Sequence, residues 1–318
     1  MVEFRTLRRE ELNQWFDHCA QVFTQGEYTD RMRLYFMRHW YNDSRRRLSG
    51  IQVAVIDGEI ASTIRVFLRN VYLQGQITAM GGIGEVSTKP QFRRQGLSSK
   101  LLEMSIAYME RQGLVVSALG TGVPNHYARY GWESIRSYRA EAQVTAARDQ
   151  DCRLLDWDDD WELNQVATVY DEYARGFNGM IVRDDLYWRR WVRSEAGRGW
   201  VLLRGDQVVA YLIANVDDNK VLQVQDFATL EPDSDSFARL VAHGVWSFGL
   251  ESAKVAFPAA IRPPGLEVEY SVRDSLMYRI NDPGMKPRLA GQSLEEWLHG
   301  GQITPEETVQ MVAAIDAF

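Results

Sequence analysis

One stretch of the sequence decides the fold expected of this chain: Ile83-Gly84-Glu85-Val86-Ser87-Thr88-Lys89-Pro90-Gln91-Phe92-Arg93-Arg94-Gln95-Gly96-Leu97-Ser98. It reads as a strand that stops at Pro90, followed by an arginine-rich loop that opens a helix. Amide groups at a helix N-terminus carry the positive end of the helix dipole, and Gly96 lets an anion approach them closely. The stretch therefore predicts a pyrophosphate cradle, with an ordinary arginine-bearing surface turn as the alternative.

The same loop excludes the common nucleotide-binding fingerprints. It lacks the Lys-Ser/Thr pair of a P-loop and the three spaced glycines of a dinucleotide-binding fold. A nucleotide hydrolase would need that Lys and a magnesium-binding Ser/Thr, so kinase, hydrolase and dehydrogenase functions are disfavoured.

The elements around this stretch are predicted from apolar periodicity and turn residues. The expected order is a strand at 4–7, helices at 10–23 and 30–40, a hairpin of 51–56 and 59–73 around Asp57-Gly58, a strand at 76–88, a helix at 97–112 and a buried strand at 114–119. After residue 151 the order begins again, with a strand at 153–156, helices at 161–174 and 184–192, a hairpin of 201–203 and 208–214, a strand at 221–228 and a helix at 236–249. We infer two copies of one fold.

Composition fits an ordinary globular protein of 318 residues, with 45% hydrophobic and 25% charged residues. The net charge of −7, from 36 basic and 43 acidic residues, disfavours a nucleic-acid-binding surface. Cys19 and Cys152 have neither disulfide nor metal-site spacing, and no metal site is predicted. The N-terminus carries no apolar signal region and no long uncharged apolar run follows, so a cytoplasmic location without membrane contact is expected.

A second motif, Asn125-His126-Tyr127-Ala128-Arg129-Tyr130-Gly131-Trp132, follows about thirty residues after the loop. The segment from Arg93 to Ser98 resembles the Arg/Gln-x-x-Gly-x-Gly/Ala acyl-CoA loop of GNAT acetyltransferases, and the segment from Tyr127 to Trp132 resembles their Tyr-x-x-x-Gly-aromatic motif. Two ordered motifs at this separation are far more specific than either one alone. The resemblance implies an α/β (α+β) class with tandem GNAT folds, each a mixed, mostly antiparallel sheet flanked by helices.

Within that superfamily the chain is similar to the bacterial Eis-type branch (enhanced intracellular survival), over about residues 1–282. The similar segments are Gly82-Ile83-Gly84-Glu85-Val86-Ser87-Thr88, Arg93-Arg94-Gln95-Gly96-Leu97, Leu186-Tyr187-Trp188-Arg189-Arg190 and Met277-Tyr278-Arg279-Ile280-Asn281-Asp282. The last of these resembles the closing strand of the branch's second domain. Ser98 replaces the final Gly/Ala of the loop. The branch usually adds a sterol-carrier-like domain, of which most is expected to be missing because only about thirty-five residues follow.

The expected domains are a catalytic acyl-CoA-binding domain at 1–150, a second, degenerate GNAT-like domain at 151–283, and a helical tail at 284–318 with a final helix from about residue 305. The second copy has Leu230-Glu231-Pro232-Asp233-Ser234-Asp235-Ser236 where the first has its Arg/Gly loop. Because an acidic loop cannot cradle an anion, this copy is not expected to bind CoA. Trp188 and Trp191 are expected to pack in its core.

The resemblance implies an N-acetyltransferase that moves an acetyl group from acetyl-CoA to a primary amine by direct attack in a ternary complex. The cofactor-binding residues that it implies are Val86, Ser87, Thr88, Arg93, Arg94, Gln95, Gly96, Leu97, Ser98, Ser99, Gly122 and Asn125. The negative balance suggests a cationic small-molecule or peptide amine. Relatives of the branch form oligomers, so a homo-oligomer is a further expectation, and a non-catalytic CoA-binding protein is the competing interpretation.

Three residues are candidates for proton transfer. Tyr127 matches the family's general acid, which protonates the departing thiolate; a packed aromatic at a helix end is the alternative. For the base, the resemblance points to the C-terminal carboxylate, here that of Phe318. Glu85 is the substitute, with an exposed strand glutamate as the plain alternative, and a water relay also stays open.

Overall fold

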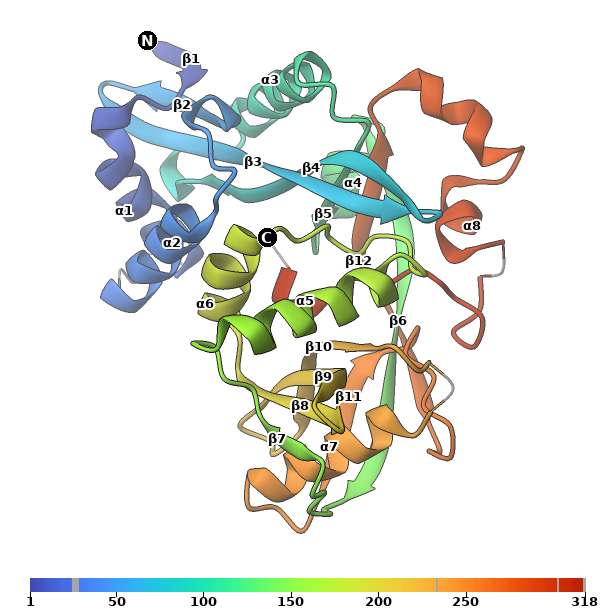
Figure 1. The fold of residues 1–318 in the computed structure, drawn as a ribbon. Helices are drawn as coiled ribbons and strands as arrows, with labels where there is room; N and C mark the ends of the chain where they lie inside the picture. The colour runs from blue at the N-terminus through green and yellow to red at the C-terminus, as the bar shows by residue number, and fades with distance from the viewer. Residues whose placement is uncertain (25–28, 233, 302, 317–318) are drawn as a thin grey trace.

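The computed structural model describes residues 1–24, 29–232, 234–301 and 303–316. Its strands form one mixed, mostly antiparallel sheet with the order β1-β2-β3-β4-β5-β12-β6-β11-β10-β9-β8-β7, flanked by helices (Figure 1). The predicted α/β class, with a mixed, mostly antiparallel sheet flanked by helices, is confirmed. In the described residues no helix is long and apolar enough to span a membrane.

The first half of the chain follows the predicted order closely. Its elements are β1 (Val2–Thr6), α1 (Leu12–Phe23), α2 (Asp30–Asn42), β2 (Ile51–Ile56), β3 (Glu59–Leu73), β4 (Gln76–Thr88), α3 (Leu97–Arg111), β5 (Val116–Gly120), α4 (Pro124–Ala128) and β6 (Glu133–Thr145). The β2–β3 hairpin turns at Asp57 and Gly58, both with positive φ. The Thr29 side chain caps α2 by accepting a hydrogen bond from the Met32 amide.

The second half repeats this order. Its elements are β7 (Cys152–Leu154), α5 (Asp160–Ala174), a π-helical segment (Tyr187–Val192), α6 (Arg193–Glu195), β8 (Arg198–Arg204), β9 (Gln207–Val216), β10 (Leu222–Thr229), α7 (Ser236–Ser247), β11 (Ser252–Pro258), β12 (Glu269–Ile280) and α8 (Leu294–His299). The π-helical turn inside the predicted helix at 184–192 was not foreseen from the sequence. Trp188 and Trp191, which lie in that turn, are buried as predicted.

The predicted final helix from about residue 305 is wrong. Residues 305–307 form a turn, and only Ala314–Asp316 form a short 3-10 helix. The intervening backbone is extended because Asn178 hydrogen-bonds both to the carbonyl of Val309, at 2.7 Å, and to the amide of Met311, at 2.9 Å. Tertiary hydrogen bonds and the burial of Met311 and Ile315 outweigh local helix preference.

The two halves exchange their last strands. β12 lies between β5 and β6, pairing antiparallel with both, and β6 continues into the second half to pair with β11. Figure 1 shows β6 running from one half of the molecule into the other. Met277 to Ile280 therefore form a strand as predicted, but this strand closes the sheet of the first half beside β5. The domain boundaries near 150 and 283 remain a prediction, and strand pairing crosses both halves.

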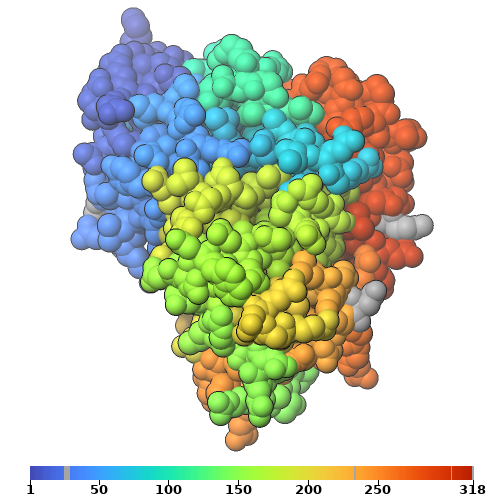
Figure 2. Space-filling model, viewed as in Figure 1, coloured from blue at the N-terminus to red at the C-terminus, as the bar shows by residue number. Residues whose placement is uncertain are grey.

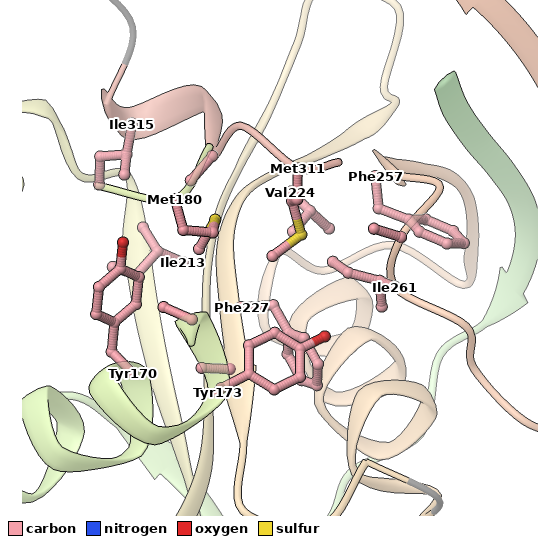
Figure 3. Close-up of a cluster of buried hydrophobic side chains, with 14 of the residues drawn as sticks. Tyr170, Tyr173, Met180, Ile213, Val224, Phe227, Phe257, Ile261, Met311 and Ile315 are labelled. Carbon is pink, nitrogen blue, oxygen red and sulfur yellow. The ribbon is translucent and has the colours of Figure 1, made fainter. Parts of the chain in front are cut away.

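Three buried clusters stabilise this arrangement. One lies under α3 and a second lies between α1, α2 and the β2–β3 hairpin. The largest fills the second half and extends to the strands at the centre of the sheet, where it includes Met311 and Ile315 of the C-terminal segment (Figure 3). Figure 2 shows the second half, green to yellow, packed directly against the blue and cyan first half.

Candidate active site

The candidate site begins where β4 and β5 separate. These parallel strands pair from Met80↔Val116 to Gly82↔Ala118. From there β4 continues to Thr88, and no strand of the described part of the chain pairs with it on that side. On its other side β4 remains paired with β3. The edge from Ile83 to Thr88 therefore offers backbone donors and acceptors to an extended ligand, as an unpaired strand edge does.

A bulge interrupts β4 at Glu85. The β3–β4 register shifts between Thr63 and Arg65, and Glu85 has a φ of +53°. Its side chain is buried, one carboxylate oxygen lies 3.2 Å from Arg65 Nη1, and the other has no hydrogen-bond partner among the described residues. Burial raises the pKa of Glu85, and the positive charges of Arg65 and His39 oppose that shift. The alternative of an exposed strand glutamate is thus wrong, because the bulge turns this side chain inward.

The loop before α3 leaves its backbone accessible. Gly96 is the N-cap with a φ of +75°, and no side chain caps the helix there. A Cβ placed on Gly96 would meet nothing within 4 Å, so an approaching ligand has open space. The first amides of a helix have no intrahelical acceptor, and Leu97, Ser98 and Ser99 occupy these positions in α3.

The arginines of this loop differ in their contacts. Arg93 Nε donates to the carbonyl of Thr88 at 3.2 Å, which folds the side chain back over the end of β4. Arg94 is exposed and has a φ of +62°. Ser98 Oγ lies 3.0 Å from His126 Nε2, and this contact links the start of α3 to α4. Burial, together with the charge of Arg129, lowers the pKa of His126.

Tyr127 projects from α4 toward the opening between β4 and β5. Its ring is 6% exposed and packs edge-on against Trp132, with centroids 6.3 Å apart. Burial raises the pKa of its hydroxyl, and a hydrogen bond with Thr121 opposes that shift. The hydroxyl therefore keeps its proton at neutral pH, as a proton donor must.

A pocket of about 910 Å³ joins these parts. It is lined by Phe23, Thr29, Arg31, Met32, Tyr35, Phe36, His39, Ile83, Gly84, Glu85, Val86, Gly120, Thr121, Gly122, Val123 and Tyr127. The sequence reasoning missed the wall that α1 and α2 provide, notably Tyr35, Phe36 and His39. The only sequence signal for this wall was the aromatic content of the second helix, and aromatic residues on a helix predict packing in a core as well as they predict a pocket wall.

The structure thus brings Glu85, Val86, Gly122 and Tyr127 together around one pocket. The side chains of Ser87 and Thr88 bond to the protein, with Ser87 Oγ 3.0 Å from His18 Nε2 and Thr88 Oγ1 2.8 Å from Ser62 Oγ. Only their backbone is left for a ligand. Asn125 is exposed on α4, and the predicted base Phe318 lies outside the described residues.

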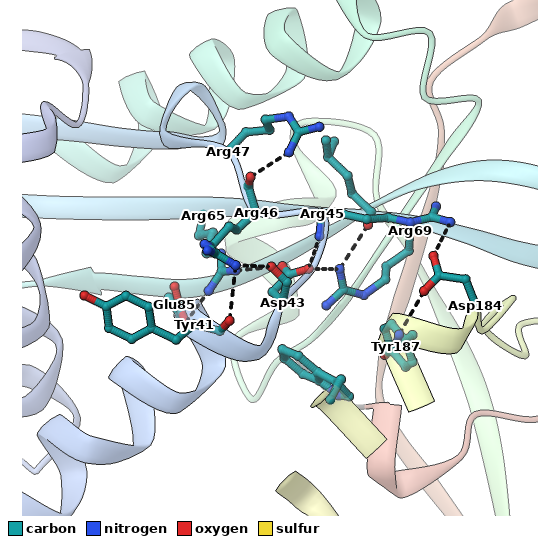
Figure 4. Close-up of polar contacts among 12 residues, drawn as sticks. Tyr41, Asp43, Arg45, Arg46, Arg47, Arg65, Arg69, Glu85, Asp184 and Tyr187 are labelled. Carbon is teal, nitrogen blue, oxygen red and sulfur yellow. Dashed lines mark hydrogen bonds and ion pairs between the residues drawn. The ribbon is translucent and has the colours of Figure 1, made fainter. Parts of the chain in front are cut away.

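A buried charge network lies directly behind Glu85 (Figure 4). Asp43, at the end of α2, accepts from Arg65 Nη2 at 2.7 Å and from Arg69 Nη1 at 3.0 Å. Both arginines pull the pKa of Asp43 below its usual value despite its burial. The adjacent run from Arg45 to Arg47 contacts protein groups, as in the Arg45–Asp184 ion pair at 3.3 Å, and only Arg47 is exposed.

Residues 3–135 match the family model described as an acetyltransferase (GNAT) domain. This segment is a GNAT acetyltransferase domain. It contains both the loop before α3 and the Tyr127 motif, as predicted. An uncharacterized N-acetyltransferase of Streptomyces griseus is 27% identical over 154 residues, which cover 45% of this chain but only 37% of the relative.

Solved structures confirm the fold well beyond this segment. A probable N-acyltransferase of unknown function from Enterococcus faecalis V583 is similar with a TM-score of 0.68 and 18% identity, covering 88% of this chain and 73% of that one. Eis1 from Mycobacterium abscessus has a TM-score of 0.62 and 17% identity, covering 91% and 75%. Yeast (Saccharomyces cerevisiae) N-myristoyltransferase with bound myristoyl-CoA has a TM-score of 0.57 and 9% identity, covering 88% and 82%.

No cluster of three or more His, Cys, Asp or Glu side chains suited to a metal ion occurs in the described ranges. Cys19 and Cys152 are both buried free thiols.

Proposed function

We propose that this protein is an acetyl-CoA-dependent N-acetyltransferase of the Eis-like branch that acetylates a primary amine by direct attack. The observation that carries the proposal is that Tyr127 and Glu85 line one pocket at the opening between β4 and β5, beside the N-terminus of α3.

The cofactor would be held by backbone groups. The unpaired edge of β4 from Val86 to Thr88 suits the amides of a pantetheine arm. The exposed loop at Gly96 and the first amides of α3 suit a diphosphate, with Arg94 available for a charge-assisted contact. Gly122, which also lines the pocket, leaves room because it has no side chain.

Proton transfer follows from the two side chains. The amine nitrogen forms a bond to the thioester carbonyl carbon as Glu85 takes the amine's proton. The carbon–sulfur bond then breaks, and Tyr127 gives its hydroxyl proton to the thiolate. Glu85 suits a base because burial raises its pKa above the usual value of a glutamate, while one carboxylate oxygen has no partner among the described residues. The carboxylate of Phe318 is the alternative base, which removal of Phe318 would test.

The acceptor is proposed to be a cationic amine, small or peptidic. Tyr35 and Phe36 line the pocket together with Glu85. Ring faces and a carboxylate both favour an ammonium group before it loses its proton. Binding of a cationic acceptor in this pocket would weaken as salt is added.

The test is release of CoA thiol from acetyl-CoA across a panel of amines. Tyr127→Phe should lower kcat at least about 100-fold with little change in CoA affinity, because only the proton donor is removed. Tyr130→Phe is the matched control, since Tyr130 neighbours the same turn at the end of α4 and keeps its ring contact with His126.

Full turnover by the Tyr127→Phe variant would remove Tyr127 from the mechanism. A chain that binds CoA and is stabilised by it, yet acetylates no amine of the panel, would favour the competing function of a non-catalytic CoA-binding protein.

A further inference from the structure

The bulge at Glu85 is a strained place for a glutamate. A φ of +53° lies in the left-handed region, which residues with a Cβ rarely adopt and which costs on the order of 1 kcal/mol or more. Glycine would fit this position without strain. Such strain persists only where surrounding contacts hold the residue in place, so the contacts of the Glu85 side chain need an explanation.

One contact divides the carboxylate into two unequal oxygens. Arg65 Nη1 lies 3.2 Å from Oε1, whereas Oε2 is buried and has no hydrogen-bond partner among the described residues. An unpaired carboxylate oxygen in a buried position is costly. Glu85 also lines the large pocket, and an N–H group that reached Oε2 from there would satisfy it.

The Arg65 side chain is fixed by aromatic rings and by a second carboxylate. It is 1% exposed on β3, and its guanidinium lies 3.9 Å from the ring centroid of Phe67 and 5.1 Å from that of Trp40. Its Nη2 donates to Asp43, whose second oxygen accepts from Arg69. Figure 4 shows the resulting line from Glu85 through Arg65 and Asp43 to Arg69. When both carboxylates are ionised, the two carboxylates and two guanidiniums of these four side chains have no net charge.

The other groups facing Glu85 come from every element around it. Cys19 faces it from α1, Tyr35 and His39 from α2, and Asp43 from the end of α2. The negative charge of Asp43 raises the pKa of Glu85, whereas the charge of Arg65 is the largest influence that lowers it. Loss of Asp43 and loss of Arg65 should therefore change the Glu85 carboxyl in opposite directions.

We propose that Arg65 is a positioning residue for the reaction: it binds Oε1 of Glu85 so that Oε2 is presented to the attacking amine, and Asp43 holds Arg65 in that place. This inference rests on the proposed function, with Glu85 as base. Arg65 lies behind the carboxylate and acts on the reaction only through it. Asp43, shared with Arg69, sets the direction of the Arg65 guanidinium.

The experiment is the pH profile of kcat/KM for acetyl transfer. In Arg65→Met the acid limb should move to higher pH by about one unit or more, because a neighbouring guanidinium lowers a carboxyl pKa by that order. Arg65→Lys, which keeps the charge, should restore most of the shift. In Asp43→Asn the limb should move the other way, to lower pH. Arg47→Met, an exposed change in the adjacent loop, is the control and should leave the profile unchanged.

These opposite shifts distinguish a positioning role from a structural defect. A purely structural defect lowers the plateau value of kcat/KM without moving the acid limb of the pH profile. An unmoved limb in folded Arg65→Met overturns the inference. If that variant does not fold, Arg65→Gln, which is polar but uncharged, decides in its place: a limb moved to higher pH supports the inference and an unmoved limb overturns it. Glu85→Gln is measured in parallel. Full activity there rejects Glu85 as base, whereas an inactive Glu85→Gln with an unmoved limb in Arg65→Met rejects only the inference about Arg65.

Discussion

Strands β4 and β10 occupy equivalent places in the two halves of the molecule. Each pairs in parallel with the following strand over a short stretch, as far as Gly82↔Ala118 in one half and Gln223↔Ala256 in the other. Each then carries a bulge next to an acidic residue, Glu85 or Asp226. Past this point the first half has a pocket of about 910 Å³. In the second half side chains such as Phe227, Phe257 and Met311 occupy much of the space (Figure 3), and the pocket beside Val224 and Met311 is only about 280 Å³.

The two carboxylates differ in the same sense. Asp226 Oδ2 accepts hydrogen bonds from Arg183 at 2.5 Å and from Tyr211 at 2.6 Å, and Arg183 also binds Asp316 of the C-terminal segment. Glu85 has Arg65 alone and faces a pocket. The repeated sheet thus supplies a bulge and a carboxylate twice. Both carboxylates keep one oxygen without a partner among the described residues, Glu85 Oε2 and Asp226 Oδ1, but of the two only Glu85 lines the large pocket.

The helix starts differ as well. α3 begins at Gly96, whose position offers no side chain to its own amides. Before α7, Ser234 Oγ accepts from the Ser236 amide at 3.2 Å, and the acidic Glu231 and Asp235 lie beside it. Asp233, part of the acidic stretch predicted to exclude CoA, lies outside the described residues. These differences support the prediction that only the first half binds the cofactor.

The largest effect expected from this comparison is on stability. Asp226→Asn should lower the free energy of unfolding by about 3 kcal/mol, because it weakens a fully buried ion pair. Urea denaturation followed by tryptophan fluorescence measures the change, with exposed Asp218→Asn as the control, expected within about 0.5 kcal/mol. Turnover per folded molecule should stay at the wild-type level. A variant of normal stability that has lost activity would break the distinction between the two carboxylates.

A somewhat smaller effect concerns pH. His18 is buried beneath β4, with Nδ1 2.8 Å from the carbonyl of Ile60, and burial lowers its pKa to about 4. Since the unfolded chain binds the proton near pH 6.5, stability should be complete above that value and fall by about 2 kcal/mol by pH 4.5. Comparing urea denaturation at pH 7.5 and pH 4.5 gives this loss.

In the His18→Gln variant, the decrease in the free energy of unfolding from pH 7.5 to pH 4.5 should be smaller than in the wild type. His243→Gln, a change in the second half, is the control and should leave most of the pH-dependent loss of stability, because the charge of Asp149 opposes the lowering of the His243 pKa by burial. An equal pH dependence in wild type and His18→Gln would show that another group is responsible.

The smallest effect sharpens the comparison of the helix ends. Gly96 and Gly249 have nearly the same φ, +75° and +74°, and a Cβ on either would meet nothing within 4 Å. Alanine at each should therefore cost a similar amount of stability, about 1 kcal/mol. Only Gly96→Ala should weaken CoA binding, by roughly 10-fold in Kd by calorimetry, because it strains the loop that presents the α3 amides. Equal CoA affinity in both variants would place the diphosphate elsewhere.

Much of the site could be predicted because its signals are local. Pro90, Gly96 and the turn before Trp132 determine where a strand stops, where a helix starts and where Tyr127 lies, and such features depend mainly on neighbouring residues. The repeated order of elements was also predictable, since each amphipathic segment shows its own period. The wall formed by Tyr35 and Phe36 was not predictable, because aromatic residues on a helix look the same whether they line a core or a pocket.

The sequence by itself determined the elements, their order and the loop and tyrosine motifs. Only the tertiary structure decided that β6 of the first half pairs with β11 of the second, and that β12 of the second half pairs with β5 of the first. It also decided that the Glu85 side chain turns inward to Arg65 and not outward to solvent. The physical reason is distance along the chain. Strand partners such as Leu276 and Gly120, and ion pairs such as Arg183 with Asp316, join residues far apart in sequence. Their choice depends on which partners satisfy buried hydrogen bonds and fill the core, which no local pattern records.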